Sequence, residues 1–149
     1  MKTQRLAGVL VLALGCGDDA APTVEVVSAT PDALVTTDDA LDDLSIVVRY
    51  EDATGDLGGG VARVHDCRSA TVVTDLEIPT ISNAAGVDEE IAISGELELV
   101  VNDVGTQPRT GVSPVCESAG VGAGAFCVVL VDAAGHESEP GCTPVLQIQ

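Results

Sequence analysis

Alternation of apolar and polar residues with a period of two is the feature that most constrains the fold of this chain. Residues 44–51 carry an apolar side chain at every even position, and residues 97–101 carry one at every odd position. Successive side chains of a β-strand point to opposite faces, so both segments are expected to be strands with one buried face. Helical periodicity is weak throughout the chain, and the pattern therefore predicts an all-β fold.

The remaining strand signals are short and are separated by turn residues. Residues 125–131 are nearly all apolar, which is typical of a central strand covered on both sides. The segment Asp132–His136 is expected to be a turn, and the Gly- and Pro-rich residues 105–124 are expected to be a surface loop. About seven short strands of this kind predict an antiparallel β-sandwich. The expected strands are residues 23–29, 44–51, 61–67, 71–76, 95–102 and 125–131, with a proline-interrupted edge strand from Glu137 onward.

Composition sets the size of the core and excludes one class of partner. The 149 residues favour a single domain, and 46% of them are hydrophobic, which is enough to form a core. Phe126 and Tyr50 are the only large rings, so aliphatic side chains must fill that core. A formal charge of −18 and the lack of tryptophan argue against nucleic acid as a partner.

The N-terminus has the order of an export signal. A short basic segment, residues 1–5, precedes an apolar stretch, residues 6–14, and then Gly15 and Cys16. The apolar stretch is too short to span a bilayer. An ordinary signal peptide that is cut nearby, with Cys16 incidental, is one interpretation of this segment.

The sequence LALGC, residues 12–16, resembles the lipobox of bacterial lipoproteins, although Ala13 stands where that family usually has leucine. The resemblance implies that residues 1–15 are removed as a lipoprotein signal peptide and that Cys16 becomes the lipidated N-terminus. Residues 16–22 would then be a polar tether, followed by a domain over residues 23–149. Gly17 in place of an aspartate favours the outer membrane or the cell surface as its location.

Residues 127–138, CVVLVDAAGHES, resemble the last hairpin of exported immunoglobulin-like and fibronectin type III-like domains. The resemblance implies an immunoglobulin-like β-sandwich. Removal of Cys16 from the count leaves four cysteines, an even number that favours two disulfides in an oxidising compartment. Zinc is the competing interpretation, but no C-x-x-C pair occurs.

The sandwich arrangement narrows the pairing of those four cysteines. Residues 61–67 would neighbour residues 125–131, whose other neighbour would be the last strand. Cys67 and Cys142 would then lie two strands apart, roughly 9–10 Å, which is beyond the reach of a disulfide. We expect Cys127–Cys142 and Cys67–Cys116, with Cys67–Cys127 and Cys116–Cys142 as the alternative.

No set of residues in the sequence predicts catalysis. His65 and Asp66 are adjacent in a strand and would point to opposite faces. His136 falls in the expected turn, and no hydrolase, metalloprotease or P-loop motif is present. The chain is therefore expected not to be an enzyme and to need no cofactor.

Calcium is the one ion that the loops bring into consideration. Calcium prefers oxygen ligands such as the carboxylates of loop residues. Asp52 and Asp56 are weak candidates for such calcium ligands. Leu57 stands where an EF-hand loop requires glycine. The other acidic or hydroxyl residues of these loops are Asp38, Asp39, Asp42, Asp43 and Thr54.

These observations predict a lipid-anchored envelope or surface β-sandwich that acts as a non-enzymatic binding or structural module. Its lipid would hold it to the membrane, and its loops would be the contact surface for an envelope protein of unknown identity. An alternative is an accessory or inhibitory subunit that docks on an envelope enzyme by strand addition at the last edge. A calcium-dependent adhesion module is a further alternative.

Overall fold

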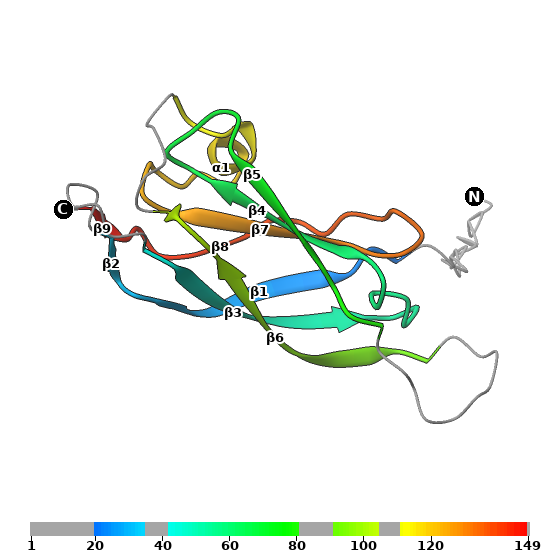
Figure 1. The fold of residues 1–149 in the computed structure, drawn as a ribbon. Helices are drawn as coiled ribbons and strands as arrows, with labels where there is room; N and C mark the ends of the chain where they lie inside the picture. The colour runs from blue at the N-terminus through cyan, green and yellow to red at the C-terminus, as the bar shows by residue number, and fades with distance from the viewer. Residues whose placement is uncertain (1–19, 35–41, 81–90, 105–110, 149) are drawn as a thin grey trace, which may run out of the picture.

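The computed structural model describes residues 20–34, 42–80, 91–104 and 111–148 (Figure 1). Nearly all regular structure is β, with one helix of five residues. The elements are β1 (Thr23–Thr30), β2 (Ala33–Leu34), β3 (Leu44–Asp52), β4 (Val61–Asp66), β5 (Val73–Glu77), β6 (Ile93–Val101), α1 (Pro114–Ser118), β7 (Phe126–Val131), β8 (Gly141–Cys142) and β9 (Gln147–Ile148).

Two antiparallel sheets form the body of the molecule. One has the order β1-β3-β6 and the other β5-β4-β7-β8, while β2 and β9 form a small parallel pair. Figure 1 shows the two larger sheets as stacked layers, with α1 outside the four-stranded one. The all-β prediction is confirmed, and the two layers fit a β-sandwich.

The core is aliphatic, as the composition requires. β3 buries Leu44, Ile46, Val48 and Tyr50 on its inner face, which is the face that the period-two pattern predicted. β7 supplies the other large ring, Phe126, to the same core. Full burial of one large aliphatic side chain contributes about 1.5–3 kcal/mol, so the alternating pattern accounts for the pairing of the two layers.

β7 is the most deeply covered strand, as its apolar sequence predicted. It lies between β4 and β8, and Val61 to Asp66 of β4 pair with Val131 to Phe126 in an unbroken register. Its inner face packs in the main core, and its outer face is covered by the segment that contains α1. The predicted turn follows it, with Gly135 at a φ of +93°.

The prediction of a surface loop over residues 105–124 is wrong at residues 114–118, which form α1. Residues 114–118 form the helix, and its Cys116 is fully buried. Pro114 at the first helical position has a preset φ and no N–H to satisfy, which favours this start. Residues 105–110 of the expected loop lie outside the described residues.

The C-terminal edge also differs from the expectation. After a single bridge between Val131 and Glu137, only Gly141 and Cys142 form β8. β1 of the other sheet contacts both β7 and β8, and a Cβ on Gly141 would lie 3.1 Å from the Val24 carbonyl oxygen. The predicted last edge is therefore short and already covered.

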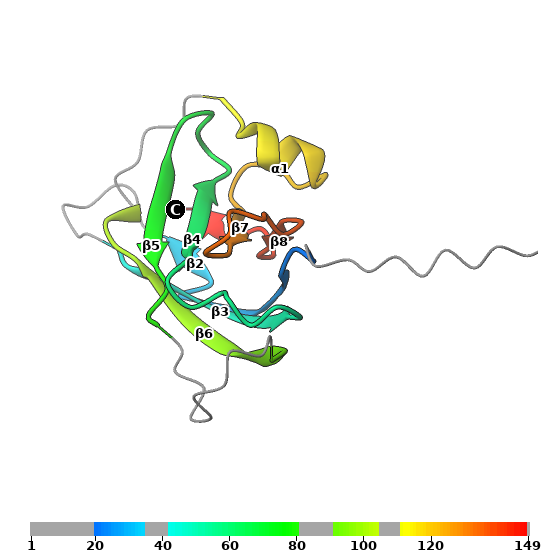
Figure 2. The same ribbon diagram turned by 90° about the vertical axis from the view of Figure 1, so that its right-hand side faces the viewer.

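The two sides of the sandwich differ as a result. On one side β1 lies against β8, and on the other side β5 and β6 are the outermost strands of their sheets. Figure 2 shows β5 and β8 at opposite sides of the four-stranded sheet. The sandwich is thus closed along β1 and open along β6.

A buried ion pair joins the end of β4 to the core. The Arg68 side chain is fully buried and donates from Nε and Nη2 to the Asp66 carboxylate, over distances of 2.9 and 2.6 Å. Nη2 also donates to the Val104 carbonyl, and the guanidinium lies 5.4 Å from the centre of the Phe126 ring. The Nη1 group is buried and has no hydrogen-bond acceptor in the described part of the chain.

We expect Asp66→Asn to lower the free energy of unfolding by about 3–5 kcal/mol, because it leaves the Arg68 charge buried without its counter-ion. Its amide oxygen can still accept the hydrogen bond that Asp66 takes from the Arg68 backbone N–H. The double variant D66N/R68M should be more stable than D66N alone. Urea unfolding measures both, and equal stabilities would contradict this account.

Candidate binding surfaces

Several of the predicted site residues lie outside the described residues. These include Cys16, the expected signal peptide 1–15, and the tether up to residue 19. Asp38 and Asp39 of the calcium candidates also lie outside them. Within the described residues no helix has the length and hydropathy to cross a membrane.

The four remaining cysteines form the two disulfides that the sequence analysis favours. Cys67 bonds Cys116 with an S–S distance of 2.02 Å, and Cys127 bonds Cys142 with 2.06 Å. Cys127 and Cys142 are paired directly across β7 and β8. In the alternative pairing Cys67 would bond Cys127, but these two sulfurs lie 3.6 Å apart and are not bonded.

The disulfides build a second, smaller core on the outer face of β7. Cys67, Cys116 and Cys127 are fully buried from solvent, and their sulfurs lie within 4.8 Å of one another. All three sulfurs are committed to disulfides, so none is a thiolate that could bind a metal ion. Cys67–Cys116 ties α1 to the end of β4, and Cys127–Cys142 joins β7 to β8.

His65 lies on the outer face of β4 beside this second core. Its Nδ1 is 3.5 Å from the Ser113 Oγ, at the limit of a hydrogen bond. Burial lowers the pKa of His65, and the nearby charge of Arg63 lowers it further. Asp66 points to the opposite face, where it pairs with Arg68. His65 and Asp66 therefore lie on opposite faces of the sheet, as predicted for neighbours in a strand.

Asp52, the first weak calcium candidate, is committed to its own loop. The side chain is 1% exposed, and Oδ1 accepts hydrogen bonds from the N–H and Oγ of Thr54 at 3.0 and 2.8 Å. Oδ2 accepts one from the buried Leu57 N–H at 2.7 Å. Asp56, the second candidate, lies 2.5 Å from the Thr54 Oγ. These contacts give the carboxylates a structural role in turning the chain from β3 to β4.

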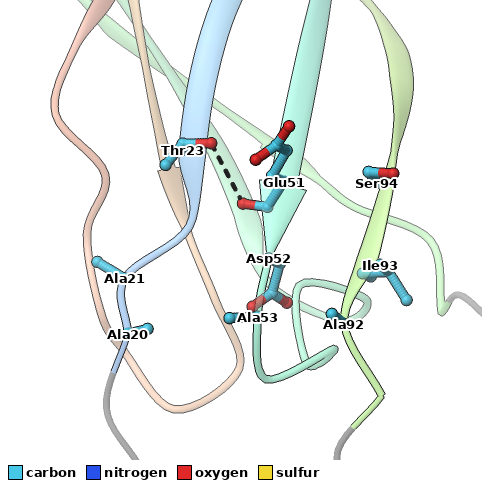
Figure 3. A pocket seen from close by; sticks show the side chains of 9 residues that line it. All are labelled: Ala20, Ala21, Thr23, Glu51, Asp52, Ala53, Ala92, Ile93 and Ser94. Atoms are coloured by element: carbon cyan, nitrogen blue, oxygen red, sulfur yellow. Dashed lines mark hydrogen bonds between the residues drawn. The ribbon is translucent and has the colours of Figure 1, made fainter. Parts of the chain in front are cut away.

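A hollow lies at the end of the three-stranded sheet, where the described chain begins (Figure 3). It has a volume of about 410 Å³, and small side chains line most of it. Figure 3 shows the hydrogen bond of 3.5 Å from Thr23 Oγ to the Glu51 carbonyl at its rim. The lining residues are Ala20, Ala21, Thr23, Glu51, Asp52, Ala53, Ala92, Ile93 and Ser94, and none of them carries a positive charge.

Charged side chains cross the outer face of the same sheet in a row. Arg49 on the central strand pairs with Glu25 on β1 at 3.3 Å and with Glu96 on β6 at 3.1 Å. Ser45 donates a hydrogen bond of 2.7 Å to Glu98, also on β6. The acids outnumber the base in this row, so the outer face near β6 carries negative charge.

The sequence analysis missed two features of these surfaces. The Asp66–Arg68 pair was missed because the segment after β4 has no repeat that indicates burial, although an arginine two residues after an aspartate was a visible signal. The free edge of β6 was missed because alternation shows which face of a strand is buried and not which strand lies at an edge.

No protein-family model, curated protein or solved structure matches this chain.

Replacement of both members of a disulfide by serine should destabilise the protein according to the length of the closed loop. Loss of Cys67–Cys116, with a sequence separation of 49, should cost about 4 kcal/mol. Loss of Cys127–Cys142, with a separation of 15, should cost about 3 kcal/mol. Denaturant unfolding measures these costs, and non-reducing peptide mapping that recovers a Cys67–Cys127 peptide would contradict the pairing itself.

Stability should fall as the pH drops below the ordinary His65 value of 6.5. The lowered pKa means that the unfolded chain takes up a proton on this histidine before the folded chain does, so protonation favours unfolding. His65→Gln should remove this component while other groups keep theirs. The measurement compares unfolding free energies of both proteins at pH 7.5 and 5.5, and identical losses would be evidence against it.

Proposed function

We propose that this chain is a lipid-anchored protein of a bacterial outer membrane or cell surface, and that its β-sandwich is a non-enzymatic binding or structural module. The observation that carries the proposal is the sequence at residues 12–16, in which a short apolar segment ends in small residues and Cys16. Two or three acyl chains on that cysteine would hold the protein firmly, at about 0.8 kcal/mol for each buried methylene.

The disulfides support an extracytoplasmic location. Pairs of this kind persist in oxidising compartments and are rare in the cytosol. All four cysteines of the domain are bonded, and the fifth, Cys16, is the one that the lipobox resemblance assigns to lipid.

The strand order supports an immunoglobulin-like or fibronectin type III-like domain. With the seven main strands lettered A to G in chain order, β1, β3 and β6 become A, B and E, which lie in one sheet. The other sheet, β5-β4-β7-β8, becomes the fourth strand followed by C, F and G. Immunoglobulin-like sandwiches group A, B and E against C, F and G in the same way.

The tether would fix which end of the domain faces the membrane. Residues 16–22 can span at most about 24 Å when fully extended. β1 begins directly after them, at the end of the sandwich that also carries the β3–β4 loop and the turn after β7 (Figure 1). The far end, with α1 and the disulfides, and the open side along β6 would remain accessible to partners.

Lipid attachment is tested by metabolic labelling of the full chain with an alkyne fatty acid in a bacterial host. We expect the wild type to be labelled and to sediment with membranes. Cys16→Ser should abolish the label and release the protein, because the thiol is the attachment atom. Cys16 belongs to neither disulfide, so non-reducing peptide mapping of the released protein should still recover both. A wild type that carries no label would refute the anchor.

A further inference from the structure

The outer edge of β6 is the longest strand edge without a partner in the described part of the chain. All nine residues of β6, Ile93 to Val101, pair with β3 on one side, and no described strand pairs with the other side. Backbone N–H and C=O groups along a free edge can add a further strand. Natural edges are usually protected by charged side chains, proline or a bulge, and β6 has neither proline nor a bulge but carries Glu96 and Glu98.

The other outer strands differ from β6 in this respect. β1 has a register shift between Val26 and Ser28 and lies against β7 and β8. β8 has two residues and follows Pro140. The edge of β5 is shorter, with five residues.

The inner face of β6 leaves apolar surface for a further strand to cover. Leu99 and Val101 are buried, but Ile93 and Leu97 are only half-buried although both pack against the core. Leu76 on β5 is half-buried on the same side of the sandwich. Apolar side chains on an added strand would bury the exposed parts of Ile93, Leu97 and Leu76.

The outer face of β6 determines which charge the added strand must carry. Glu96 and Glu98 are exposed and lie two residues apart, so both flank the edge on the solvent side. Directly opposed like charges destabilise a strand pair, and opposite charges stabilise it. The added strand must therefore carry basic residues at alternate positions.

A second copy of this chain does not meet that requirement. Antiparallel pairing of two β6 strands about Leu97 would set Glu96 against Glu98. Pairing about either glutamate would set that residue against its own copy. β6 contains no lysine or arginine, so no register of a second copy sets a basic residue against Glu96 or Glu98, and we assign the edge to a different protein.

We propose that the β6 edge binds an extended segment of another protein in which Lys or Arg alternates with aliphatic residues, by addition of a strand to the sheet β1-β3-β6. This inference names a partner class for the proposed binding module. It does not depend on the lipid anchor, so labelling at Cys16 and binding at β6 can fail separately.

The test uses the full chain and a synthetic peptide, TVKVRVKVT, with blocked ends. Calorimetry should detect binding, and hydrogen exchange should show new protection of β6 amides. The variant E96K/E98K should bind the peptide roughly tenfold or more weakly, because two attractions become repulsions. The same variant should acquire binding of the acidic peptide TVEVEVEVT.

The matched control is E25K/E51K, which changes the net charge equally on the same outer face. Glu25 also pairs with Arg49, so each variant removes one ion pair of that arginine. The added strand would lie roughly 10–15 Å from Glu25 and Glu51, beyond the screening length of about 8 Å at physiological salt. We expect less than a threefold loss of binding.

Two N-methylated peptides test the backbone contribution without altering the protein. One is methylated at its valines and the other at its basic residues. Neighbouring N–H groups of a strand point to opposite edges, so one of these peptides should lose binding and the other should retain it. Equal binding by both, or equal losses in E96K/E98K and E25K/E51K, would overturn strand addition in favour of diffuse charge attraction. Absence of binding by the parent peptide would overturn the proposal as well.

Discussion

The antiparallel pairing of β4 with β7 is the interaction on which the rest of the structure depends. It places two strands in the middle of the four-stranded sheet and brings residues distant in sequence into one register. On the inner face this pairing sets Val64 against Val128 in the core. On the outer face it brings Cys67 and Cys127 together, so that the two disulfides lie next to each other. The α1 segment is held there as a consequence.

The same pairing explains where the polar groups of β4 go. His65 and Asp66 are neighbours in sequence, yet one faces the second core and the other faces Arg68 beneath the sheet. A catalytic arrangement would require both on one face. The strand geometry therefore separates the two side chains, and Asp66 pairs with Arg68 just after the end of β4.

Negative charge lies beside β6, the longest strand edge without a partner in the described residues. Arg49 neutralises part of the row on the outer face, but Glu96 and Glu98 remain beside the edge of β6. A strand edge that is flanked by two glutamates and has half-buried apolar side chains is suited to a partner of opposite charge. In the β3–β4 loop, the Asp52 carboxylate accepts hydrogen bonds from the loop's own backbone N–H groups.

The sequence by itself determined the strands, because the two-residue period of residues 44–51 and the apolar run of residues 125–131 report burial face by face. It also narrowed the disulfide pairs, since strand neighbours limit which cysteines can meet. Only the tertiary structure decided that residues 114–118 form a helix, that Arg68 is buried and that β6 is the open edge. Those outcomes depend on which strands become neighbours and what covers them, and a local pattern contains no record of such contacts between distant residues.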